Sequence, residues 1–82
     1  MATRKQNEGR FKRWKDLANG GREYWKDRPG EISGFQRIIK IVDEHETTQL
    51  ILQEVYDDDN NLIQRHQKFP MDTGHQYLDS EE

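Results

Sequence analysis

The sequence contains no cysteine, and apolar residues make up only 30% of its 82 residues. Without disulfides to stabilise a small secreted domain, a reducing compartment is favoured. No apolar run approaches the roughly 18 residues of a membrane-spanning helix, and no apolar secretory stretch follows Met1. We therefore expect a cytoplasmic protein without a membrane segment.

The low apolar content is unevenly distributed, with most of it between Phe35 and Phe69. That local density makes a folded core credible, although charged residues reach 35%. The length fits one domain, which we place at residues 1–78, and the acidic tail 79–82 is expected to be disordered.

The net charge is −3, but the two ends of the chain differ in sign. Residues 1–30 carry nine Lys and Arg against four Asp and Glu, whereas residues 31–82 carry four against twelve. This polarity suits either an anionic partner at the basic end or attraction between the two segments.

A helix is predicted over residues 8–18. Asn7 is the expected N-cap, and Asn19-Gly20-Gly21 supplies the stop. Apolar residues recur at spacings of three and four along one side: Phe11, Trp14, Leu17 and Ala18. Residues 19–34 are interpreted as a connector.

Three strands are predicted at residues 35–42, 48–56 and 62–69, each rich in aliphatic or aromatic residues. The polar turns between them are short, which favours an antiparallel meander. The predicted fold class is therefore α+β, with the N-terminal amphipathic helix packed on a three-stranded antiparallel sheet.

Both faces of this sheet are expected to be apolar. If Val42 pairs with Thr48 and Tyr56 with Leu62, one face carries Phe35, Ile39, Ile41, Ile51, Val55, Ile63 and Phe69. The other face carries the candidate interface residues Ile38, Val42, Leu50, Leu52, Tyr56 and Leu62. One short helix covers one face, so the second face is expected to bind another copy or a larger protein. Alternatively, residues 19–34 and 70–78 fold over it.

The string Tyr56-Asp57-Asp58-Asp59-Asn60-Asn61-Leu62 resembles the tyrosine-aspartate hairpin of RHS repeats, Y-D-x-x-G-N-L. Asn60 stands where that pattern has glycine, and a three-residue turn needs a left-handed residue there. The resemblance covers about ten residues and implies a hairpin. Similar hairpins in toxin modules attached to RHS proteins hint at such a relative.

Two further sets of residues are candidates for chemistry. The basic residues Arg10, Lys12, Arg13 and Lys15, interleaved with aromatics, suit nucleic-acid binding, although the pI of about 5.6 argues against it. Glu54, His66 and Lys68 share a face in the predicted register, as a small RNase-like toxin would require.

Neither a cofactor nor a metal site is predicted, because His45, His66 and His75 lack zinc-ligand spacing. We therefore expect a non-catalytic protein-interaction or regulatory module, working as a homodimer or bound to a larger protein. A nucleic-acid binder and an RNase-like toxin are the alternatives.

Overall fold

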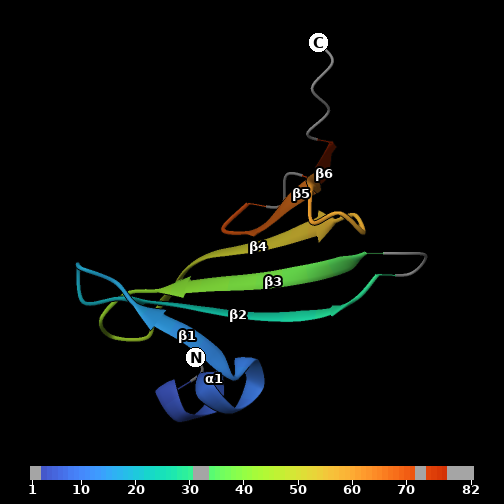
Figure 1. Cartoon of the computed structure of the whole chain (residues 1–82). Helices are drawn as coiled ribbons and strands as arrows, with labels where there is room; N and C mark the ends of the chain where they lie inside the picture. Colours follow the sequence, from blue (N-terminus) through green and yellow to red (C-terminus); the bar gives the residue numbers. More distant parts are fainter. Residues whose placement is uncertain (1–2, 31–33, 72–73, 78–82) are drawn as a thin grey trace.

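The computed structural model of the chain describes residues 3–30, 34–71 and 74–77 (Figure 1). In these ranges one helix, α1 (Arg4–Phe11), precedes six strands that form a single antiparallel sheet in the order β1-β2-β3-β4-β5-β6. The strands are β1 (Arg13–Asp16), β2 (Arg22–Pro29), β3 (Phe35–Val42), β4 (Thr48–Tyr56), β5 (Leu62–Phe69) and β6 (Gly74–Tyr77). The α+β class is thus confirmed, but the sheet has more than the three predicted strands.

The helix lies earlier in the chain than predicted. Thr3, not Asn7, is its N-cap, and Thr3 and Gln6 form a reciprocal capping box. The helix ends at Lys12, whose φ of 69° is left-handed. The prediction of a helix over 8–18 is therefore wrong, because this early stop sends Trp14 into β1.

The predicted connector at 19–34 is also wrong over half of its length. Residues 22–29 form β2, which pairs with β3 along its whole length. Asn19-Gly20-Gly21 belongs to the β1–β2 turn, with Gly20 at φ 91°, and ends no helix. The left-handed glycine was recognised, but a hairpin uses such a residue as readily as a helix end does.

The three predicted strands are present as β3, β4 and β5, and Val42 pairs with Thr48 and Tyr56 with Leu62 as expected. Residues 74–77, at the end of the chain, add β6 beside β5. The predicted disordered tail at 79–82 lies outside the described residues.

The predicted assignment of side chains to the two faces is wrong. Next to the Val42–Thr48 pair the register slips, so that Ile41 pairs with Leu50 and Gln49 is an extra residue. A second slip beside Tyr56 leaves Ile63 unpaired. Because a one-residue slip exchanges the faces of a strand, Ile39 and Ile41 lie on the same face as Leu50 and Leu52.

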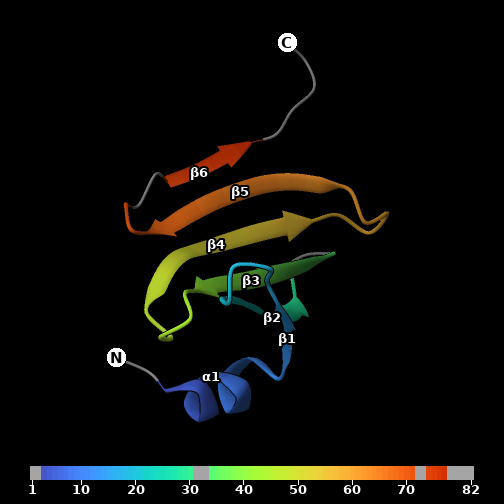
Figure 2. The ribbon, with the colours of Figure 1, turned by 90° about the vertical axis from the view of Figure 1, so that its left-hand side faces the viewer.

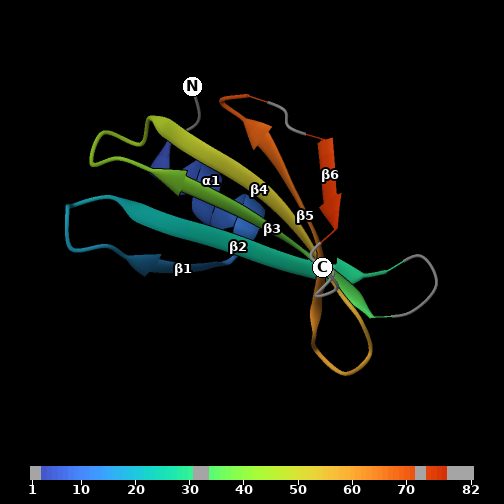
Figure 3. The ribbon, with the colours of Figure 1, turned by 90° about the horizontal axis from the view of Figure 1, so that it is seen from above.

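The helix covers one face of the sheet (Figure 3), where it contacts β1 and β2. Phe11 packs there against Tyr24 and Val42, with Ile38 beside them. The ring centres of Phe11 and Tyr24 lie 5.7 Å apart, and Tyr24 is fully buried. The hydrophobic core among the described residues is therefore small and lies on the α1 side of the sheet.

Three hairpin turns of the sheet share one geometry. Each has a three-residue loop whose third residue is left-handed: Gly20, Glu46 and Asn60. In the Asp57 turn, the Asp57 carboxylate accepts hydrogen bonds from the backbone amides of Asp59 and Asn61. The left-handed position predicted for Asn60 is confirmed, with a φ of 67°.

Candidate functional site

The face of the sheet that points away from α1 is covered by no element within the described residues; we call it the open face (Figure 2). Cross-strand pairing arranges its side chains in four rows, because paired residues of antiparallel strands share a face. The rows are Lys15-Glu23-Ile41-Leu50, Arg13-Trp25-Ile39-Leu52, Asp27-Arg37-Glu54-Arg65 and Pro29-Phe35-Tyr56-Leu62.

The first two rows carry the apolar centre of the open face. Ile39 is only 9% exposed, and Trp25, Ile41, Leu50 and Leu52 around it are half-buried. Residues 22–29 and 74–77, which could have folded over this face, instead extend the sheet at its sides. Among the residues that the structure describes, the apolar centre is therefore buried by its own neighbours in the sheet.

The third row is a ladder of alternating charge. Arg37 donates from Nε and Nη2 to the two carboxylate oxygens of Asp27, at 2.8 and 3.1 Å. Arg65 Nη2 lies 3.5 Å from Glu54 Oε2. The hydrogen bond from Arg37 holds the pKa of Asp27 below its ordinary value, so both groups of that pair remain charged at neutral pH.

The fourth row is aromatic. The rings of Phe35 and Tyr56 stack with centres 4.7 Å apart and planes 9° from parallel. The Arg37 guanidinium lies 5.7 and 5.5 Å from these two ring centres. Tyr56 also donates to Glu54 at 2.7 Å, and burial together with that carboxylate raises the pKa of Tyr56.

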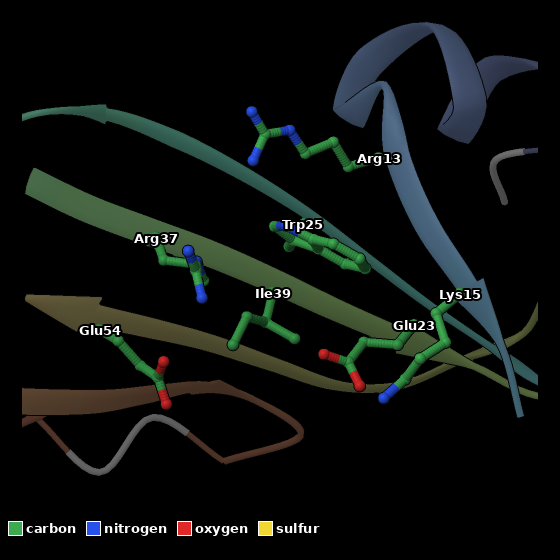
Figure 4. A pocket seen from close by; sticks show the side chains of 7 residues that line it. All are labelled: Arg13, Lys15, Glu23, Trp25, Arg37, Ile39 and Glu54. Carbon is green, nitrogen blue, oxygen red and sulfur yellow. The ribbon is translucent and has the colours of Figure 1, made fainter. Parts of the chain in front are cut away.

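A hollow of about 490 Å³ lies on this face, between the β1 edge and the charged ladder. Figure 4 shows Ile39 at its floor, with Trp25 on one side and the heads of Arg37 and Glu54 on the other. The remaining lining residues are Arg13, Lys15 and Glu23. The lining thus mixes both signs of charge around an apolar floor.

The structure divides the six predicted interface residues. Leu50, Leu52, Tyr56 and Leu62 lie on the open face, whereas Ile38 and Val42 lie on the α1 side, where Val42 is in the core. Trp25 and Ile39 belong to the open face and were not among the candidates. The alternation within β3 correctly placed Ile39 on the same face as Phe35 and Ile41. The register slip that places Leu52 on that face as well has no signal in the sequence.

The residues proposed for RNase chemistry do not converge. Glu54 pairs with Arg65 on the open face, and His66 pairs with Gln53 on the α1 side. Lys68 is an extra residue at the register slip between Gln67 and Phe69. The predicted shared face is wrong because the slip beside Tyr56, at Ile63, moves His66 to the face opposite Glu54.

The predicted basic helical face is also wrong. Arg10 belongs to α1 and Lys12 caps it, whereas Arg13 and Lys15 lie on β1 beside the hollow. Arg13 comes within 3.9 Å of Asp27 there. The four cations therefore do not form one surface.

A buried polar network on the α1 side was not predicted from the sequence. Glu46 Oε1 accepts from Asn7 Nδ2 at 3.0 Å and from the Tyr24 hydroxyl at 2.8 Å, and Oε2 accepts from Arg4 Nε at 3.3 Å. Lys40 Nζ donates to Asn7 Oδ1 at 2.9 Å. The network connects α1 to the turn between β3 and β4. Of its members, only Asn7 was assigned a role from the sequence, as the N-cap of the helix.

Burial and hydrogen bonding together shift the pKa values of two groups in this network. Burial acts to raise the pKa of Glu46, but hydrogen bonds from Asn7, Tyr24 and Arg4 outweigh it and hold the pKa below its ordinary value. Burial, and then the nearby charge of Arg10, lower the pKa of Lys40. The charged form of Glu46 is therefore stabilised by its hydrogen-bond donors, whereas the charged form of Lys40 is destabilised by burial.

Comparison of the chain with models of protein families, with curated proteins and with solved structures found no match. Among the described residues, no helix is long and apolar enough to cross a membrane. No group of three His, Asp or Glu side chains in the described ranges is placed to hold a metal ion. The open face, with its hollow, apolar centre and charged ladder, is the candidate site.

Proposed function

We propose that the chain is a non-catalytic protein-interaction module whose binding surface is the open face. The observation that carries this proposal is an apolar centre, flanked by a charged ladder and an aromatic row, over which the described part of the chain places no covering layer. Protein-binding surfaces combine a buried apolar or aromatic centre with a polar rim in this way.

The chemistry of the hollow supports binding more than catalysis. Glu54 is bound by Tyr56 and Arg65, and Arg37 by Asp27. These side chains are thereby held by one another. Electrostatics also favour a protein over a nucleic acid, because Glu23, Asp27 and Glu54 stand among Arg13, Lys15 and Arg37.

The proposal is tested by co-purification from cells that carry two differently tagged copies at native abundance. We expect Leu52→Glu, which places a charge in the apolar centre, to remove the specific co-purifying proteins, including the second tagged copy if that is the partner. Met71→Glu is the control, because Met71 is 69% exposed and lies outside the strands.

The thermal unfolding of both variants is measured first, so that loss of binding is read only from a folded protein. An identical set of partners for the wild type, Leu52→Glu and Met71→Glu would contradict the assignment of the binding surface to the open face.

A further inference from the structure

We infer that the partner of the open face is a second copy of this chain, bound face to face. The two copies are related by a two-fold axis that runs along the strands, between β3 and β4. This inference rests on the proposed function and adds to it the identity of the partner and the geometry of the complex.

The charged ladder selects the axis. Across β2, β3, β4 and β5 its charges run negative, positive, negative, positive: Asp27, Arg37, Glu54 and Arg65. A two-fold axis along the strands reverses the strand order of the facing copy. Asp27 then faces the other copy's Arg65, and Arg37 faces its Glu54, so every charge of the row meets its opposite.

A two-fold axis across the strands gives the opposite result. It places each strand over itself, so that Asp27 meets Asp27 and Arg37 meets Arg37 when the ladders overlap. Like charges brought together at an interface cost several kcal/mol, which disfavours a complex. The ladder therefore distinguishes the two face-to-face arrangements.

The apolar rows agree with the axis along the strands. Ile39 then faces the other copy's Leu52, Ile41 faces its Leu50, and Phe35 faces its Tyr56, because these residues are already paired across β3 and β4. In these three contacts apolar residues meet apolar residues, and aromatic residues meet aromatic residues. The Leu52 side chain of the second copy is also directed at the floor of the hollow, which Ile39 forms.

The size of the face suffices for a dimer. The molecule measures 39 by 23 by 22 Å along its principal axes. A face of that length and width provides an area comparable to the roughly 800 Å² per partner of a standard interface. Two such sheets stack about 10 Å apart with their strands nearly aligned, as in β-sandwiches.

The first test reverses one contact of the ladder. Asp27→Lys and Arg65→Glu each place like charges opposite each other in a homodimer, so we expect each to weaken dimerisation by about a hundredfold in sedimentation equilibrium. An equimolar mixture restores both contacts and should form a heterodimer with near wild-type affinity. Met71→Glu should dimerise as the wild type does.

The second test needs no charge reversal and remains informative if those variants fold poorly. Because the chain has no cysteine, Ile39→Cys and Leu52→Cys are unique thiols that should face each other across the axis. A short bis-maleimide should cross-link the mixture of the two more strongly than either variant alone. Gln64→Cys, on the α1 side opposite Val55, should not cross-link.

Each outcome bears on the inference. A monomer at millimolar concentration overturns the second copy as the partner, and a dimer in which Ile39→Cys cross-links mainly to itself overturns the axis. Either result leaves the co-purification test of the open face standing, because that test also detects unrelated partners. Heterodimer rescue together with the mixed cross-link supports both the partner and the axis.

Discussion

At the scale of single residues, Glu46 combines a left-handed backbone with a buried carboxylate that accepts three hydrogen bonds. Its φ of 64° is left-handed, a conformation that glycine and asparagine adopt more easily and that costs an ordinary residue about 1 kcal/mol. The residue is 9% exposed, and its carboxylate accepts hydrogen bonds from Asn7, Tyr24 and Arg4. These contacts with α1 and β2 explain why the turn holds a glutamate.

Replacing Glu46 with glutamine should destabilise the fold by about 1–2 kcal/mol. The amide keeps the size of the side chain but removes the charge that pairs with Arg4, and its NH₂ group faces another donor. Urea unfolding at pH 7 measures the change. Glu44→Gln is the matched control, because Glu44 lies in the same turn and its side chain is 62% exposed. Equal stability of the two variants would show that the network contributes little.

The same carboxylate predicts a pH dependence. Its pKa in the folded protein lies below the ordinary value of 4.5. Its stabilisation is therefore complete above pH 4.5 and is lost as the pH falls through the lower pKa of the folded state. Urea midpoints between pH 7 and pH 2.5 should decline below pH 4.5 in the wild type, and less steeply in Glu46→Gln. Parallel curves for the two proteins would contradict this assignment.

At the scale of elements, the left-handed residue at Lys12 decides where α1 ends and β1 begins. Lys12→Gly should stabilise the protein by about 1 kcal/mol, because glycine adopts this φ without strain. In the continuous helix predicted over 8–18, the same change would destabilise by about 1 kcal/mol. Lys12→Ala keeps the β-carbon and is the control, for which no such gain is expected. Urea unfolding of the three proteins decides between the two chain paths.

The sequence predicted β3, β4 and β5 because each is a dense run of aliphatic and aromatic residues between polar turns. It did not predict β2, whose alternation of Tyr24 and Trp25 with charged residues is irregular and was assigned to a connector. The N-terminal helix was misplaced because Phe11, Trp14 and Leu17 happen to repeat at helical spacing. The left-handed backbone at Lys12 ends the helix despite that spacing. A lysine gives no sequence signal for this conformation.

The composition of the open face could be predicted only in part for a related reason. Three of its rows include Leu50, Leu52 and Tyr56, which were expected to share a face. Whether Ile39 joins them depends on one extra residue, Gln49, at a register slip. Such a slip is set by the turn and by packing on both faces, which period-two patterns do not encode.

At the scale of the whole molecule, the distribution of buried apolar side chains is lopsided. The core of Phe11, Tyr24 and Val42 lies on the α1 side, while no element of the described ranges forms a second layer over the apolar centre of the open face. A domain of this length buries a smaller fraction of its surface than a large domain does, so it has little stability in reserve. Covering the open face with a second copy would make the sheet the middle of a sandwich.

If folding and dimerisation are linked in this way, the stability of the wild type should depend on its own concentration. A tenfold rise in protein concentration favours a folded dimer over two unfolded chains by about 1.4 kcal/mol per dimer, so the urea midpoint should rise. Arg65→Glu, expected to be monomeric over the same range, should unfold at a midpoint that does not move. A wild-type midpoint constant from micromolar to millimolar concentration would mean that the small core on the α1 side stabilises the sheet unaided.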